Sequence, residues 1–169
     1  MEYNRIFIVG GPGSGKTTLA KKLSKIINTK YYELDDIAYK KRSTYEKRDE
    51  RERDKKIKSI IKRKKWVVEG FYSRPWIYPL YKKSDVVLIL NIKPSTLKRR
   101  IILRFIKRKL LFKKTKKHNK QVKEIIPLLK RIDKYPTKQF RLQKRASKRF
   151  NKNVLILNNQ KEINNFLKT

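Results

Sequence analysis

A glycine-rich stretch over residues 10–18 carries the clearest chemistry in this sequence. It fits the pattern G-x-x-x-x-G-K-[ST], and four of the chain's five glycines fall within it. A loop without β-carbons can turn its backbone N–H groups toward phosphate oxygens, and the helix that follows adds the positive end of its dipole. The stretch predicts a phosphate-binding loop formed by Gly10, Gly11, Pro12, Gly13, Ser14, Gly15, Lys16, Thr17 and Thr18.

Two side chains at the end of this loop have types that suit phosphate chemistry. Lys16 is expected to reach the β- and γ-phosphates of ATP, and the Thr17 hydroxyl to bind Mg²⁺ beside them. Thr18 is the weaker candidate for the metal. An apolar strand over 4–9 precedes the loop and a helical pattern to Ile27 follows it. This context favours a phosphate loop over a chance match in a hairpin or a helix cap.

Apolar strands and amphipathic helices alternate along the rest of the chain. Apolar runs of strand length occur at 4–9, 31–34, 66–68, 86–92 and 153–157. Helical patterns occur up to 27 and at 57–61, 94–111, 122–132, 137–150 and 162–167. A mobile or weakly helical segment is expected at 40–54, a loop or turn at 71–81 and an exposed loop at 113–120. This order predicts a single α/β domain with a parallel sheet, whose ligands bind at the carboxyl ends of the strands.

The composition limits the compartment and the class of site. The chain has no Cys, so it forms neither a disulfide framework nor a thiolate metal site. Its clean apolar runs have the length of strands and none is long enough to span a bilayer. We therefore expect a cytoplasmic protein with no membrane partner.

Positive charge is concentrated in the second half of the sequence. The chain has 49 Lys and Arg residues against 14 Asp and Glu, a net charge of +35. Residues 86–169 hold 26 basic residues and three acidic ones, and residues 98–120 hold twelve basic residues and no acid. Such a block attracts polyphosphates or nucleic acid, although a general bias of the host toward Lys would also produce it.

Beyond the phosphate loop, several stretches resemble the small P-loop kinases of the adenylate/shikimate kinase type. The resemblance is strongest to their adenylate kinase-related group, labelled "DNA topology modulation protein". It rests on the phosphate loop and on the stretches Leu34-Asp35, Trp66–Arg74, Arg100 with Arg104, and Lys134–Pro136. It implies a three-layer P-loop NTPase domain with a five-stranded parallel sheet in the order 2-3-1-4-5 and helices on both faces. It also implies an acceptor-binding helical region at about 36–65 and a basic lid at about 105–122.

The resemblance also suggests roles for individual side chains. Asp35 would orient or deprotonate the acceptor, and the alternative is that it caps a helix. Glu69 stands where relatives have Asp and would act on Mg²⁺, with a solvated acid at the strand end as the alternative. Gly70 and Arg74 would help to bind the acceptor, with a surface ion pair as the alternative for Arg74. Arg100 and Arg104 lie four residues apart on one helical face and would hold the ATP phosphates as arginines of the lid, with a solvated basic face as the alternative.

Two classes of function fit these features. The leading one is ATP-dependent phosphoryl transfer to a small acceptor, which we expect to be a nucleotide or nucleoside-like molecule. The alternative is a nucleic-acid-binding P-loop NTPase of the topology-modulation type with a regulatory nucleotide site. Its support is the basic stretch 98–120 and the aromatic residues Phe105, Phe112, Tyr135, Phe140 and Phe150. A GTPase is disfavoured because the sequence has no Asn-Lys-x-Asp motif, and a membrane-surface helix over 97–117 is a third, weaker alternative.

Overall fold

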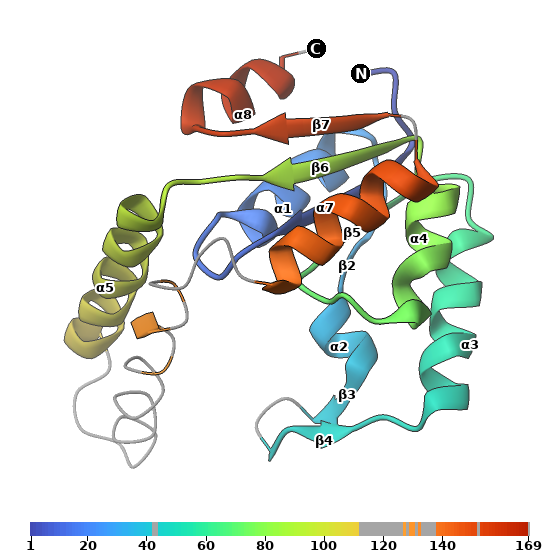
Figure 1. Cartoon of the computed structure of the whole chain (residues 1–169), viewed down its shortest axis with the longest axis horizontal. Helices are drawn as coiled ribbons and strands as arrows, with labels where there is room; N and C mark the ends of the chain where they lie inside the picture. The colour runs from blue at the N-terminus through green and yellow to red at the C-terminus, as the bar shows by residue number, and fades with distance from the viewer. Residues whose placement is uncertain are drawn as a thin grey trace.

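Five parallel strands form the centre of the molecule in a computed structural model that describes residues 1–41, 44–111, 127, 129, 130, 132, 138–151 and 153–168 (Figure 1). In their spatial order the strands are β2 (Tyr31–Glu33), β5 (Trp66–Gly70), β1 (Arg5–Gly10), β6 (Val86–Leu90) and β7 (Val154–Leu157). Counted along the chain within this sheet, the order is 2-3-1-4-5. The predicted fold class and strand order are therefore confirmed. A small antiparallel pair, β3 (Tyr39–Lys41) with β4 (Glu46–Lys47), was not predicted.

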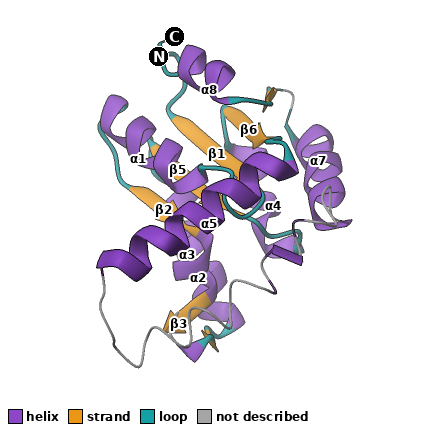
Figure 2. Ribbon diagram, turned by 90° about the vertical axis from the view of Figure 1, so that its left-hand side faces the viewer, coloured by secondary structure: helices purple, strands orange, loops and turns teal. Residues whose placement is uncertain are grey.

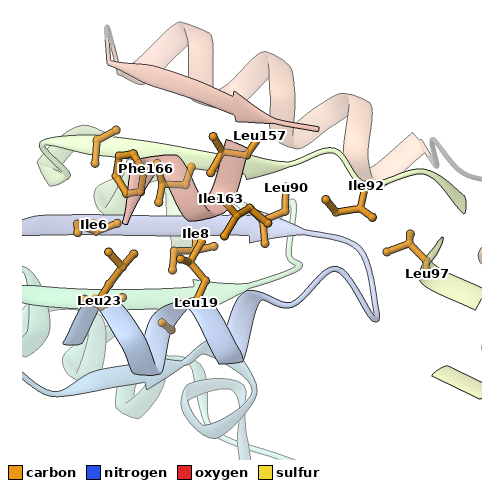
Figure 3. Packing of buried hydrophobic residues seen from close by; sticks show 14 of the residues in the cluster. Ile6, Ile8, Leu19, Leu23, Leu90, Ile92, Leu97, Leu157, Ile163 and Phe166 are labelled. Carbon is orange, nitrogen blue, oxygen red and sulfur yellow. The ribbon is translucent and has the colours of Figure 1, made fainter. Parts of the chain in front are cut away.

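Alternating side chains of the strands build a core on each face of the sheet. Ile6 and Ile8 of β1 point to one face, whereas Phe7 and Val9 point to the other. The first face is covered by α1 (Lys16–Ile26), the start of α5 (Pro94–Leu111) and α8 (Gln160–Phe166), as the packing in Figure 3 shows. The second face is covered by α2 (Leu34–Ala38), α3 (Glu50–Ile61), α4 (Tyr78–Lys83) and α7 (Lys138–Phe150). Helices thus cover both faces of the sheet and make three layers (Figure 2).

The amino end of the sheet is closed by an acidic side chain that lies away from the phosphate loop. Asp85 accepts hydrogen bonds from the backbone N–H groups of Asn4 and Arg5 at 3.0 and 2.8 Å. It also forms a two-point ion pair with the Arg5 guanidinium, at 2.9 and 2.6 Å. Burial acts to raise the pKa of Asp85, but the hydrogen bonds from Arg5 outweigh it and the pKa is lowered. Asp85 therefore joins β1 to the start of β6 as a carboxylate.

The structure corrects the prediction for residues 40–54, which form the β3–β4 pair and the first turn of α3. Asp49 caps α3, because its carboxylate accepts from the N–H groups of Arg51 and Glu52. The capping alternative for Asp35 is also wrong, since Asp35 lies inside α2, whose cap position is Glu33. Sequence patterns missed the β3–β4 pair and the cap of α3 because polar local hydrogen bonds, not an apolar stripe, specify them.

Two further predictions about secondary structure and burial need correction. Residues 71–81, predicted as a loop or turn, contain the 3₁₀ turn Pro75–Ile77, but they also continue into the helix α4, which was not predicted. The helical pattern of α5 predicts that Ile101, Ile102, Phe105 and Ile106 are buried; Ile101 is buried, whereas Ile102 and Ile106 are exposed. Of the lid predicted at 105–122, only residues 105–111 are described, and they form the end of α5. The predictions for 113–120 and for most of 122–132 lie outside the described residues.

Within the described ranges, no helix has both the length and the apolar composition that a bilayer crossing requires.

Candidate active site

A cleft of about 1470 Å³ opens at the carboxyl end of the sheet, beside β1 and β5. Its walls include all but two of the residues predicted for the site: Pro12, Gly13, Ser14, Gly15, Lys16, Thr17, Thr18, Asp35, Glu69, Gly70, Arg74, Arg100 and Arg104. Gly10 and Gly11 lie behind this surface. A β-carbon on Gly10 would approach the Ser14 Oγ and the Leu90 Cβ to 2.9 Å, so Gly10 permits close packing behind the loop.

The phosphate loop has the backbone of an anion-binding turn. Gly13 and Gly15 have φ angles of +76° and +96°, which glycine adopts without steric cost. Gly15 occupies the cap position of α1, and no side chain caps this helix end. The first turn of α1 contains no acidic residue. Its backbone N–H groups and its dipole can therefore act on a phosphate group.

Lys16 lies in the wall of the cleft, and its Nζ donates to the Gly11 carbonyl at 3.2 Å. Burial lowers the pKa of the ammonium, and the negative charges of Glu69 and Asp35 counteract this shift. The positive charge of Arg104 lowers the Lys16 pKa further, which places Arg104 within electrostatic range. Lys16 is thus a desolvated cation whose charge the neighbouring carboxylates offset only in part, and a phosphate oxygen would stabilise it.

Thr17 and Glu69 meet inside the cleft although they are far apart in the sequence. The Thr17 Oγ1 donates to the Glu69 Oε1 at 2.6 Å. Glu69 is 4% exposed, and burial raises its pKa, with Lys16 and Thr17 acting in the opposite direction. A hydroxyl beside a buried carboxylate fits Mg²⁺, which takes oxygen ligands and keeps several waters. No cluster of three or more His, Cys, Asp or Glu side chains occurs among the described residues, so phosphate and water would supply the other ligands.

Asp35 stands on α2 and faces the opposite part of the cleft. Its Oδ1 accepts a hydrogen bond from the Tyr72 hydroxyl at 2.8 Å. Burial, with a contribution from Asp35, raises the pKa of Tyr72, so that the phenol stays protonated and remains a donor. Tyr72 packs edge-on against Trp76, with ring centroids 5.2 Å apart. The carboxylate is therefore exposed to the cleft but has a fixed hydrogen-bond partner.

Gly70 contributes to the site by letting α2 come close to β5. A β-carbon at this position would lie 2.6 Å from the Leu34 Cβ. Leu34 is fully buried and directly precedes Asp35. The missing side chain of Gly70 therefore sets where the carboxylate of Asp35 stands.

The three predicted arginines line the cleft, two of them from α5 and the third from the segment after β5. Arg100 donates to the Ser14 carbonyl at 3.1 Å and to the Gln160 Oε1 at 2.9 Å, so it already supports the phosphate loop. Arg104 lines the same wall one helical turn further along α5. Arg74 is exposed and begins the 3₁₀ turn after β5. The i, i+4 spacing thus brings Arg100 and Arg104 to one cleft, as the sequence predicted.

Several residues of the cleft carried no strong signal in the sequence. Tyr39 and Tyr45 of the β3–β4 region pack edge-on with centroids 5.9 Å apart, and Tyr45 is 62% exposed with a φ of +53°. Gln143 of α7 is fully buried and donates to the Tyr72 carbonyl at 2.6 Å. Tyr72 lies inside the stretch 66–74 that carries the family resemblance, and this is the one available signal for it.

Comparisons with known proteins agree with this geometry. A family model described as "AAA domain" matches residues 6–113. A curated relative from Pyrococcus furiosus, named "Putative adenylate kinase", is 34% identical over 101 residues. That match covers 57% of this chain and 53% of the relative, so the chain spans about half the length of the curated relative that it matches.

Solved structures of similar fold cover almost the whole chain. Shikimate kinase from Acinetobacter baumannii, in complex with shikimate, aligns over 99% of this chain and 90% of its own, with a TM-score of 0.56 and 18% identity. Shikimate kinase from Bacteroides thetaiotaomicron aligns over 98% and 95%, with a TM-score of 0.54 and 19% identity. At these identities the likeness concerns the fold. The chain belongs to the AAA domain family and has the fold of the P-loop kinases of the adenylate/shikimate kinase type.

Proposed function

We propose that this protein transfers the γ-phosphoryl group of ATP to a nucleotide or nucleoside-like acceptor. The observation that carries the proposal is the shared cleft. The phosphate loop with Lys16 and the Thr17–Glu69 pair forms one part of its wall, and Asp35 with Tyr72 forms another. A phosphate donor and an acceptor bound in these two parts would meet between them. Such positioning, together with charge stabilisation, provides most of the catalysis in phosphoryl transfer.

The nucleotide part of the cleft has a role for each of its charged groups. The N–H groups of the loop and of the first turn of α1 would bind the phosphates, and the Lys16 ammonium would neutralise charge on them. Thr17, with Glu69 acting on coordinated waters, would hold Mg²⁺, which would supply positive charge next to the phosphates. Arg100 and Arg104 would close over the same phosphates from α5.

The acceptor part supplies a base for a hydroxyl nucleophile. The acceptor oxygen forms a bond to the γ-phosphorus while the bond from that phosphorus to the bridging β–γ oxygen breaks, which leaves ADP. The proton of the hydroxyl passes to the Asp35 carboxylate, whose orientation Tyr72 maintains by its hydrogen bond. Where the acceptor is a phosphate, no proton has to move, and Asp35 would orient the acceptor only.

The lining of the acceptor part favours a planar ring over a small aliphatic acid. Four aromatic side chains line this part of the cleft, namely Tyr39, Tyr45, Phe71 and Tyr72. Aromatic side chains stack on nucleobases, and this gain does not depend on which base is present. The exposed guanidinium of Arg74 stands in the same wall, where it suits a phosphate or a sugar hydroxyl.

An acceptor screen tests this function. Purified protein is incubated with Mg²⁺ and γ-labelled ATP, and label is followed into nucleosides, nucleoside monophosphates, shikimate, gluconate and water. We expect transfer to at least one nucleoside or nucleotide at a rate well above hydrolysis and, where the accepting group is a hydroxyl, loss of that transfer in Asp35→Asn. Transfer to shikimate or gluconate alone would contradict the proposed acceptor class. Hydrolysis without transfer to any acceptor would contradict a kinase.

A further inference from the structure

A basic surface on α7 stands apart from the cleft chemistry. Six of the thirteen residues of this helix are Lys or Arg and none is acidic. On a helix with 3.6 residues per turn they share an arc of about 140° and extend over about 16 Å of its axis. All six are exposed, and together they define the α7 basic face: Lys138, Arg141, Lys144, Arg145, Lys148 and Arg149.

The opposite side of α7 packs into the core. Phe140, Gln143 and Ser147 are buried, and Ser147 Oγ donates to the Gln143 carbonyl at 2.7 Å. Gln143 also holds the Tyr72 carbonyl, so the helix is fixed against the sheet by polar and apolar contacts. Figure 1 shows α7 in front of the sheet, on the side away from α1. The basic face is therefore presented outward on a helix whose orientation is set by the core.

Within the described part of the chain, no ion pair compensates the charges of the α7 basic face. Neighbouring α4 adds cations, because Lys82 Nζ and the Arg149 guanidinium both lie over the Phe150 ring, at 5.2 and 5.3 Å. Repulsion between like charges gathered in this way costs stability. On α3, by contrast, Arg53 pairs with Glu50 and Asp54. A general bias toward Lys would raise the charge of both helices, but it does not explain why α7 has no acid.

The basic stretch predicted at 98–120 is less suited to an external partner than α7. Arg100 is bound to the phosphate loop and to Gln160, and Arg104 lines the cleft. Residues 112–120 lie outside the described residues. Of the aromatic residues considered for base stacking, Phe140 lies in the core with 5% exposure, and Phe150 packs against Tyr78 with ring centroids 4.8 Å apart. A partner of α7 would therefore be held by charge and not by base stacking on these rings.

The chemistry of the α7 basic face favours one class of partner. A membrane-surface helix needs a free apolar face, and the apolar face of α7 is buried. Six cations over about 16 Å match a backbone that carries one charge per about 1.7 Å of duplex axis. Three of the six are Arg, whose planar fork binds phosphate oxygens in pairs. We propose that the α7 basic face binds the phosphate backbone of a nucleic acid.

The position of this surface relates it to the cleft. Leu142 lies beside Arg141 and Arg145 on α7, is 41% exposed, and lines the main cleft. A strand bound along α7 would therefore run past the acceptor part of the cleft. The proposal does not rest on the kinase reaction, because it concerns exposed cations that the cleft chemistry does not use.

A matched pair of variants tests the proposal. The α7 variant carries Arg141→Gln, Lys144→Gln, Arg145→Gln and Lys148→Gln, and keeps Arg149 on its aromatic partner. The control carries Arg51→Gln, Lys55→Gln, Lys56→Gln and Lys58→Gln on α3, where all four side chains are also exposed. Both variants lose the same net charge. Circular dichroism and melting temperature confirm that each is folded, and anisotropy of fluorescent duplex DNA measures binding over a range of salt.

The expected result is a difference in both affinity and salt dependence. Removing four phosphate contacts should make the log–log salt slope shallower by about 3.6, and weaken binding at low salt by about 100-fold. The α3 control should change the slope by less than about 1 unit. Single-stranded DNA and RNA probes then identify which form of backbone binds best, and poly-glutamate should bind less tightly than any of them.

Three outcomes would overturn the proposal. Equal losses in the two variants would mean that net charge alone attracts DNA. Poly-glutamate binding as tight as that of DNA would mean that the face does not select phosphate. Loss of binding to phosphatidylserine vesicles in the α7 variant, with DNA binding unchanged, would assign the face to a membrane surface.

Discussion

The two parts of the cleft place their functional groups by different means. In the nucleotide part, nine consecutive residues supply the loop, the cation and the hydroxyl, and Glu69, Arg100 and Arg104 join them from β5 and α5. In the acceptor part, Asp35 and Tyr72 come from segments 37 residues apart and meet only because α2 packs on β5. A contiguous loop tolerates change around it, whereas an assembled pair depends on the packing beneath it. Substitutions in the two parts should therefore fail in different ways.

The largest effect is expected in the phosphate loop. Lys16→Ala should lower turnover by about 1000-fold and weaken ATP binding, because removal of a phosphate-neutralising charge costs several kcal/mol. The melting temperature should not fall, since burial of this ammonium is unfavourable without a phosphate. Calorimetric ATP titration and thermal melting of the same preparation give both values. Unaltered ATP affinity in a folded variant would contradict the assignment of the loop.

Loss of the Asp35 carboxylate should impair the acceptor part of the cleft and spare the nucleotide part. Asp35→Asn should lower transfer to a hydroxyl acceptor by about 100-fold or more, the usual contribution of a general base, and leave ATP affinity within about threefold. Tyr72→Phe should have a smaller effect in the same direction, because it removes the hydrogen bond but keeps the base. Steady-state kinetics with the acceptor found in the screen gives both values. A Tyr72→Phe effect larger than that of Asp35→Asn would contradict the roles given to this pair.

The two α5 arginines should affect phosphoryl transfer more than ATP binding. Arg100→Ala and Arg104→Ala should each lower kcat by about 10-fold to 100-fold with a smaller effect on ATP affinity, because their charge matters most in the transition state. Arg100 should show the larger structural cost, since it also supports the Ser14 carbonyl. Rapid-quench kinetics isolates the chemical step. Full turnover in both variants, with chemistry limiting, would place these arginines outside the mechanism.

Packing beneath the acceptor part gives a smaller but diagnostic effect. Gly70→Ala should cost about 1–3 kcal/mol of stability, because its methyl group would overlap Leu34 and force α2 to move. It should lower acceptor turnover and leave ATP affinity almost unchanged. In a double-mutant cycle, Leu34→Ala should relieve part of the cost of Gly70→Ala, which chemical denaturation measures. Strict additivity would mean that the two side chains do not compete for the same space.

The smallest effect on activity is expected at the amino end of the sheet. Asp85→Asn should cost about 1–2 kcal/mol of stability by weakening its charge-assisted hydrogen bonds. Because the pKa of Asp85 is lowered on folding, its contribution is present above about pH 4 and is lost as the pH falls through the folded pKa. Urea unfolding of both proteins across acidic pH should therefore converge at low pH. An undiminished difference there would contradict this account of Asp85.

The sequence predicted those features that depend on local pattern. Apolar runs and the loop motif predicted the parallel sheet and the approach of Lys16 and Thr17 to one cleft, whereas the strand order came from the family resemblance. The β3–β4 pair and the cap of α3 escaped prediction, since a few polar contacts specify them. The Tyr72–Asp35 contact escaped because it depends on how closely α2 packs on Gly70, a distance that no sequence pattern encodes.

The most direct test of the two-part cleft is the affinity for ATP and the rate of phosphoryl transfer, measured together in Lys16→Ala and Asp35→Asn. The account predicts that Lys16→Ala loses both, whereas Asp35→Asn loses transfer and keeps ATP affinity. Loss of ATP affinity in Asp35→Asn as large as that in Lys16→Ala, or full transfer without the carboxylate, would contradict it.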